Sequence, residues 1–335
     1  MIHTDMPTAS TTLAALLDRA QAFAPEYGGS LSTHLPMALV SLNALGADAP
    51  RMEAFFTTIS ARLNAAPPTA AACDDWLTLR GDGAAFASVR AYFLRAIADH
   101  GRDVVLQQAL PSLVDGVGAV AFHGLLRTAS ATVANHDAEL ASGLAVWATG
   151  HLPLASFVAE QTLAAGSVDV ADWLAHMAAL GDAWRVDTGT ITPQMRAFVR
   201  TPAFRDGVDR LAVHNRTLRE LAAQALAIYL RTNNFTVLHL ITSAHALRLL
   251  MPWLEEPLIA VRHYARAHAA GVAASDVKID APIMAVNVLS WPDALRAGAA
   301  SDDEHVIKLV YACHEEWRFT GAADYQSAAS LAVAT

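Results

Sequence analysis

The chain has 335 residues, of which 54% are hydrophobic, and its formal net charge is −9. This length and apolar content suffice for one large core, and an acidic balance without basic runs argues against nucleic acid as a partner. Alanine is abundant and few segments are rich in Val, Ile, Thr and aromatic residues, so we expect an all-α protein, a single-domain multi-helix bundle over residues 1–335. The histidines of the chain add the expectation that this bundle encloses a central metal site.

Helical periodicity of the apolar residues predicts the elements in chain order. The first helix covers residues 13–20 with Thr11 or Thr12 as its N-cap, and loops are expected at 27–30 and 65–72. Further helices are expected at residues 34–45, 51–64, 83–100, 104–133, 136–148, 153–165, 169–180, 193–200, 205–231, 236–253, 256–270 and 304–319.

Evidence for strands is thin. Residues 279–284 are compatible with an extended segment that lacks an obvious partner, and residues 186–190 are typical of a loop. The mean hydropathy of +0.30 raises the question of a membrane span. The longest uncharged run, 141–159, is interrupted by glycine, histidine and proline, so a buried core helix is expected and no membrane partner.

Compartment and cofactor signals are mostly negative. Cys73 and Cys313 cannot make a disulfide framework, and the first eleven residues lack the basic region of a secretory signal, so a cytoplasmic protein is expected. The chain has no phosphate loop, no complete dinucleotide fingerprint, no G-x-S-x-G and no H-E-x-x-H. A built-in flavin or NAD domain is therefore not supported, while the use of NADPH and the oligomeric state stay open.

Four histidines, His34, His123, His239 and His305, stand inside or beside apolar runs. A buried imidazole costs free energy unless its nitrogens find partners, and imidazole is the commonest metal ligand among side chains. Taken singly, each is also explained as a core or surface histidine; together they suggest convergence on one metal. The histidines near charges or helix ends are expected to be solvated: His3, His100, His136, His176, His214, His263 and His268.

Lys308 is unusual because Lys278 is the only other lysine in the chain. It follows His305 by three residues, so both lie on one helix face beside an apolar stripe. A buried amine near cationic charge loses its proton readily, and a neutral amine can react with carbon dioxide to give a carbamate. The alternative is a lysine at the edge of a surface helix. His245 cannot face the same point as His239, six residues earlier on the helix. It is therefore either an alternative to one of the four histidine ligands or a residue that hydrogen-bonds to a ligand and orients it.

These residues and their neighbours resemble the questin oxidase-like family, a group of helical oxygenase-type proteins. The matching segments keep the family's order: 27–29 with 33–36, then 41–47, 122–127, 143–148, 238–243 and 305–312. The family often has Asn where this chain has Thr33. The resemblance implies oxidation of anthraquinone-type polyketides by Baeyer–Villiger-like or ring-opening chemistry. It also implies a mononuclear non-haem iron centre held by these ligands: His34, His123, His239, His305 and a carboxylated Lys308.

We therefore expect an iron-dependent oxygenase that uses dioxygen on a small aromatic or quinone-like molecule, with His305 and Lys308 acting in catalysis. The same ligands also suit zinc, manganese or nickel. Arg127 is expected to bind either an anionic substrate group or an acidic helix neighbour. Two alternatives stay open: a non-catalytic helical protein with core histidines or a structural metal, and a metal-dependent hydrolase. Candidate pocket residues, each also explained as core, are Tyr27, Met37, Phe122, Trp147 and Trp291.

Overall fold

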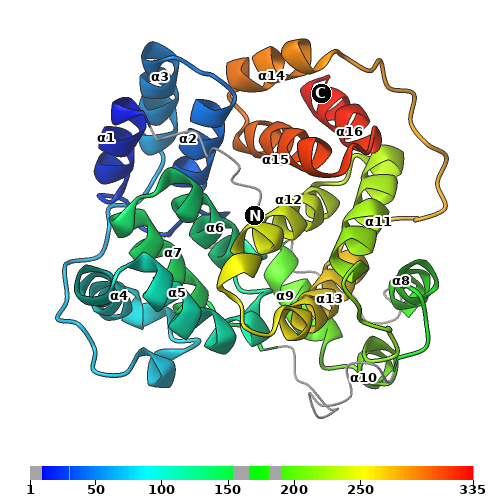
Figure 1. Cartoon of the computed structure of the whole chain (residues 1–335), viewed down its shortest axis with the longest axis horizontal. Coiled ribbons are helices and arrows are strands. Elements are labelled where there is room, and N and C mark those ends of the chain that lie inside the picture. Colours follow the sequence, from blue (N-terminus) through cyan, green and yellow to red (C-terminus); the bar gives the residue numbers. More distant parts are fainter. Residues whose placement is uncertain (1–9, 30, 154–165, 181–189, 335) are drawn as a thin grey trace.

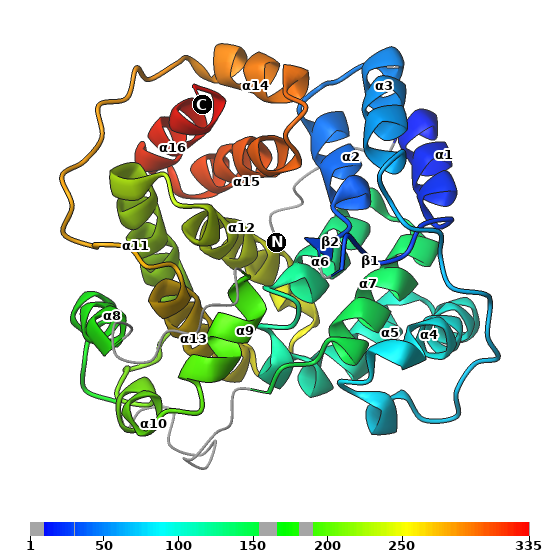
Figure 2. The ribbon, with the colours of Figure 1, turned by 180° about the vertical axis from the view of Figure 1, so that it is seen from behind.

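The protein is described by a computed structural model that covers residues 10–29, 31–153, 166–180 and 190–334. These residues form sixteen α-helices, a few 3-10 turns and one two-stranded hairpin, which confirms the all-α fold. Figures 1 and 2 show the helices gathered around a few central ones. In the described part of the chain, no helix is both long and apolar enough to cross a membrane.

The hairpin pairs β1 (Glu26–Tyr27) with β2 (Leu31–Ser32) in antiparallel register. The helices of the first half are α1 (Thr11–Ala20), α2 (Leu35–Ala44), α3 (Ala49–Ser60), α4 (Phe86–His100), α5 (Arg102–Ala109), α6 (His123–Ala134) and α7 (Asp137–Thr149). Those of the second half are α8 (Val170–Ala179), α9 (Ile191–Phe198), α10 (Pro202–Val208), α11 (Thr217–Thr232), α12 (Phe235–Leu250), α13 (Pro257–Ala274), α14 (Trp291–Ala300), α15 (Glu304–Thr320) and α16 (Asp324–Val333).

Four helices close into a ring at the centre of the molecule, and we call it the four-helix ring. In it α2 packs on α6, α6 on α12, α12 on α15, and α15 back on α2. Other helices cover it from outside: α3 lies on α2, α7 on α6, α13 on α12, and α14 and α16 on α15. Eight of the ten residues of α2 and thirteen of the sixteen residues of α12 are buried, which is the pattern of helices enclosed on all sides.

Most of the predicted helices are confirmed to within a few residues, but the two longest are wrong. The segment predicted at 104–133 divides into α5, two 3-10 turns and α6, because Pro111 and a later turn with positive φ angles interrupt the helix. The helix predicted at 205–231 is also divided in two, because α10 ends at Val208 and α11 begins only at Thr217. There the Thr217 hydroxyl accepts a hydrogen bond from the backbone N–H of His214 at 2.9 Å, an alternative to helical pairing.

Two helices near the C-terminus were not predicted, α14 and α16. Signals for α14 are nevertheless present, since Ser290 caps it by accepting from the Asp293 N–H and a proline occupies its first turn. The N-cap of α1 is Ser10 and not Thr11 or Thr12.

Of the remaining segments, 65–72 contains no helix, as predicted. In the loop predicted at 27–30, Tyr27 ends β1, Gly28 and Gly29 form a turn, and Ser30 lies outside the described residues. Residues 279–284 form no strand. The helix predicted at 153–165 and the loop at 186–190 lie almost wholly outside the described residues.

Arg127 is a structural residue. Its guanidinium binds both carboxylate oxygens of Glu139 on α7, at 2.5 and 2.9 Å, and both side chains are almost completely buried. Gln21 donates a further hydrogen bond to Glu139 at 2.8 Å. The acidic helix neighbour is therefore the partner of Arg127, and this bidentate pair ties α6 to α7.

The expectation of solvated histidines holds for His100 and His176, whereas it is wrong for His263 and His268; His3 lies outside the described residues. His263 and His268 lie on α13, which is enclosed by α8, α9, α11 and α12. His268 contacts the Tyr264 hydroxyl through Nδ1 at 3.3 Å. Burial lowers its pKa to about 3.

This buried imidazole predicts a pH dependence of stability. The unfolded state takes up the His268 proton near pH 6.5 and the folded state only near pH 3, so the contribution of the neutral ring is complete above pH 6.5 and declines as the pH falls toward 3. Relative to a His268→Phe variant, the parent protein should lose on the order of 2 kcal/mol between pH 7.5 and 4.5 in urea unfolding. His100→Gln, at an exposed histidine, should leave the pH profile of the parent unchanged.

Candidate metal centre

Each helix of the four-helix ring brings a histidine to one place near its N-terminal end. His34 is the N-cap of α2, His123 is the first residue of α6, and His305 is the second residue of α15. His239 lies in the second turn of α12, and Lys308 lies one turn beyond His305. We call the four imidazoles the histidine cluster. The ring of helices thus joins segments more than 250 residues apart in the sequence.

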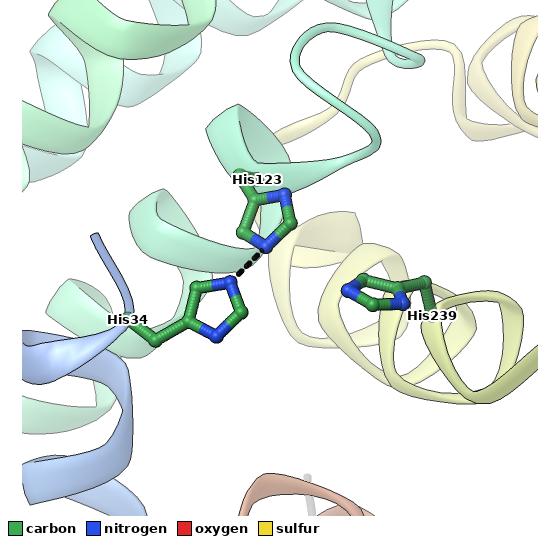
Figure 3. Close-up of side chains that lie close together, drawn as sticks. All are labelled: His34, His123 and His239. Carbon is green, nitrogen blue, oxygen red and sulfur yellow. Dashed lines mark hydrogen bonds between the residues drawn. The ribbon is translucent and has the colours of Figure 1, made fainter. Parts of the chain in front are cut away.

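Three of the four imidazoles are close enough to share one ion. His34, His123 and His239 each offer a ring nitrogen, and these nitrogens all lie within 4.8 Å of one another. Figure 3 shows the rings of His34 and His123 facing each other, with 2.6 Å between their Nε2 atoms, and His239 turned toward them from α12. All three side chains are buried.

His305 and Lys308 lie against this group from the side of α15. The His305 ring centroid is 4.5 Å from that of His34 and 5.4 Å from that of His239. The Nε2 atom of His305 is buried and has no hydrogen-bond partner among the described residues. The Lys308 amine lies 3.2 Å from Nδ1 of His34 and is buried. All five residues named from the sequence therefore meet in one place.

The hydrogen bonds of the Nδ1 atoms define which nitrogen carries the proton in three of the rings, those of His123, His239 and His305. Nδ1 of His123 lies 2.6 Å from the Val120 carbonyl, and Nδ1 of His239 lies 2.9 Å from the Phe235 carbonyl. Nδ1 of His305 lies 3.2 Å from a carboxylate oxygen of Asp303. Carbonyl and carboxylate oxygens only accept, so each Nδ1 donates and each Nε2 keeps its lone pair for a metal.

Burial also keeps the cluster uncharged. It is the largest cause that lowers the pKa of all four imidazoles, and the neighbouring Lys308 lowers each further. The pKa of His123 falls to about 3. Burial likewise lowers the pKa of the Lys308 amine to about 7. At neutral pH the centre therefore presents neutral imidazoles, the form that binds metals, and a partly neutral amine.

A strained turn sets the position of His123. The three residues before it, Val120, Ala121 and Phe122, have φ angles of 49°, 53° and 69°. This left-handed region is costly for residues with a Cβ, above all for a β-branched one. The turn places the Val120 carbonyl at the His123 ring and ends in the first turn of α6. Strain of this kind gathers at functional sites.

Gly124 allows α6 to approach α7 directly behind the cluster. A Cβ at this position would lie 2.6 Å from Cα of Trp147, and one at Gly143 would lie 2.8 Å from the backbone N of Thr128. We expect Gly124→Ala to force α6 away from α7, to cost about 1–3 kcal/mol in denaturant unfolding and to weaken metal binding, because His123 moves with the helix. Gly83→Ala meets no atom within 4 Å and should change neither quantity.

The sequence analysis missed the acidic and basic groups beside the cluster. Glu304 lies 3.7 Å from Nδ1 of His34 through one carboxylate oxygen, and one terminal nitrogen of Arg62 donates to both of its oxygens at 2.6 and 2.7 Å. The Arg62 guanidinium also lies 5.6 Å from the centre of the Tyr27 ring. The acid directly before His305 was a visible signal for Glu304, whereas nothing in the sequence pointed to Arg62.

Phe235 was also missed and marks a side of the cluster that reaches solvent. The residue is 53% exposed, yet the centroid of its ring lies 4.8 Å from that of the His239 ring and 4.6 Å from that of the His305 ring. Of the five aromatic and Met residues named as pocket candidates, Tyr27 lies beside Arg62 at this centre. The other four are buried in the core: Met37, Phe122, Trp147 and Trp291.

His245 does not belong to the histidine cluster. Its Nδ1 lies 2.7 Å from a carboxylate oxygen of Glu316, and both side chains are buried. It therefore faces a different partner from His239, as the six-residue spacing on α12 requires.

The comparison with protein families adds a finding to this geometry. The model of the Questin oxidase-like family matches residues 31–313, a range that contains the whole histidine cluster and Lys308. The chain belongs to the Questin oxidase-like family. A comparison with curated proteins gives no match. Membership indicates an oxidoreductase that acts on a small molecule of anthraquinone type.

Proposed function

We propose that this member of the Questin oxidase-like family is a mononuclear non-haem iron oxygenase for planar, quinone- or polyketide-like substrates. The supporting observation is the meeting of the four imidazoles and the Lys308 amine at the ends of the four-helix ring. Family membership supports the oxidoreductase class. The metal, its ligands and the substrate are the parts that we propose.

The donor set fits a divalent metal. Three Nε2 atoms have lone pairs that their Nδ1 bonds leave available, and the buried Nε2 of His305 has no other partner among the described residues. Imidazole suits iron, as it does zinc, copper and nickel. The proposed ligands that would hold the ion are His34, His123, His239, His305 and one oxygen of a carboxylated Lys308.

An anionic fifth ligand suits the electrostatics of this place. The N-terminal ends of three helices, α2, α6 and α15, lie at the cluster, and each carries a partial positive charge. Neutral imidazoles do nothing to offset that charge or the charge of a cation. A carbamate on Lys308 would place a negative charge among the ligands themselves, in addition to the Glu304 and Asp303 carboxylates beside the Nδ1 atoms of His34 and His305. The partly neutral amine required for its formation is present because burial lowers the pKa of Lys308.

Iron bound in this way would supply the activation of dioxygen. The chain itself positions the substrate and the ligands. The half-exposed Phe235 ring gives a planar molecule an aromatic surface next to the cluster. Arg62 uses one terminal nitrogen for Glu304, which leaves further N–H groups to donate to a quinone or phenolate oxygen. Asp303, Val120 and Phe235 hold the imidazoles through their Nδ1 atoms.

The test is anaerobic reconstitution with Fe(II), followed by elemental analysis and by oxygen uptake with a hydroxylated anthraquinone. We expect about one iron per chain and oxygen consumption that depends on the substrate. Turnover without oxygen would support the hydrolase instead. Iron that stays bound but never binds nitric oxide, a probe of an open position, would support a structural metal.

A further inference from the structure

A small cavity lies inside the four-helix ring and has Lys308 in its wall. Its volume is about 30 Å³, room for a molecule of about one to three heavy atoms. Most of its lining is apolar and comes from all four helices, with Met37 from α2, Leu126 from α6, Leu249 from α12 and Ala312 from α15 among the residues. The histidine cluster is not part of this lining, so the cavity reaches Lys308 from another direction.

His245 also lines the cavity and carries a ring nitrogen without a partner. Glu316 accepts from its Nδ1 at 2.7 Å, which leaves Nε2 as an acceptor. That Nε2 is buried and has no hydrogen-bond partner among the described residues. Arg248 holds the same Glu316 oxygen at 2.6 Å, and the Tyr311 ring packs edge-on against the imidazole at 5.5 Å. The imidazole is therefore fixed, with one basic atom unused.

We propose that this cavity is the site where carbon dioxide binds before it carboxylates Lys308, and that His245 accepts the proton released in the reaction. The inference rests on the proposed function, in which Lys308 is a carboxylated ligand. It adds where the reagent binds and which side chain takes the proton. Neither follows from the identity of the metal ligands.

The polar groups of the cavity match this reaction. The hydroxyl of Ser41 donates to the Met37 carbonyl at 3.0 Å, and that of Thr242 donates to carbonyls one turn earlier on α12. These hydroxyl protons are thus already engaged. The other polar residues of the lining are Ser130, Tyr311, His245 and Lys308, and the two last bring the only nitrogen-bearing side chains. The largely apolar walls suit an uncharged linear molecule better than a bicarbonate ion.

The step balances without an oxidant or a further reactant. The Nζ lone pair of Lys308 forms a bond to the carbon of carbon dioxide, and one C–O π pair moves onto oxygen. A proton leaves Nζ for Nε2 of His245. The products are a carbamate with one negative charge and an imidazolium, which the Glu316 carboxylate stabilises until its proton passes to solvent.

The test follows carbamate formation in the metal-free, full-length protein by ¹³C NMR after addition of ¹³C-bicarbonate with its dissolved ¹³C-labelled carbon dioxide. Because the chain has only Lys278 and Lys308, a Lys278→Met background leaves Lys308 and the α-amine as carbamate-forming groups, and the signal that disappears in Lys278→Met/Lys308→Met belongs to Lys308. We expect Ala246→Leu, which fills the cavity, and His245→Gln, which removes the acceptor, each to slow carboxylation at least tenfold. His314→Gln, outside the cavity, should carboxylate at the parent rate.

Melting curves show whether each variant is folded. Ala246→Leu enlarges a side chain, whereas His245→Gln replaces an imidazole by an amide, so the proposal can still be tested if one of the two variants folds poorly. Carboxylation at the parent rate in a folded Ala246→Leu protein would overturn the cavity as the carbon dioxide site, and the same result for His245→Gln would overturn the proton acceptor. The proposed iron centre would stand in both cases. A parent protein that forms no carbamate at Lys308, with or without Fe(II), would instead refute the carboxylated ligand itself.

Discussion

Replacing Lys308 by methionine is expected to lower iron occupancy at least tenfold and to abolish oxygen-dependent turnover. Methionine fills a similar buried volume, so the change removes the proposed site of the carbamate without opening a large cavity. The proposed anionic ligand would then be absent among neutral imidazoles and positive helix ends, and even residues that only support a ligand cost about 10–100-fold in metal affinity. Iron per chain and oxygen uptake measure the effect.

Lys278→Met is the matched control, since Lys278 is the only other lysine and lies exposed. It should bind iron and turn over like the parent protein. A Lys308→Ala protein should regain part of its iron when acetate or propionate is supplied, because a free carboxylate can occupy the space of the missing arm. If the Lys308→Met protein kept full iron occupancy and activity, the lysine would not be a ligand.

The second large effect is expected at α12. His239→Ala should lower the affinity for Fe(II) by more than tenfold, because it removes one of the three nitrogens that lie within 4.8 Å of one another. Titration of the apoprotein with Fe(II) under anaerobic conditions, followed by elemental analysis, measures the loss.

A buried histidine away from the cluster separates a ligand from a general packing effect. His268 is at least as deeply buried as His239, lies on α13 and faces Tyr264. His268→Phe should therefore keep parental Fe(II) affinity even if it melts at a different temperature. Equal losses of iron in both variants would show that damage to the core, and not a missing ligand, lowers the metal content.

The sequence carried much of this site. Apolar residues around His34, His123, His239 and His305 indicated burial, and burial of imidazole needs a reason. The rarity of lysine drew attention to Lys308. Helical periodicity predicted the elements of the four-helix ring, apart from where α6 begins.

Other features depend on three-dimensional contacts that a pattern does not encode. The start of α6 at His123 rests on three residues with positive φ angles, and none of them is a glycine that would announce such a turn. His268 is buried because other helices enclose α13 from several sides. Arg62 reaches the centre across 242 residues of sequence through Glu304. These contacts follow from how the helices pack, and periodicity describes only which face of a helix is apolar.

The most direct measurement is a crystal structure of the protein reconstituted with Fe(II), with diffraction data collected on both sides of the iron absorption edge. The account predicts one anomalous peak, bound by Nε2 atoms of the cluster and by an oxygen of a carboxylated Lys308, with one position open beside Phe235. An iron peak elsewhere, no peak after reconstitution, or an unmodified Lys308 amine beside a fully occupied ion would contradict it.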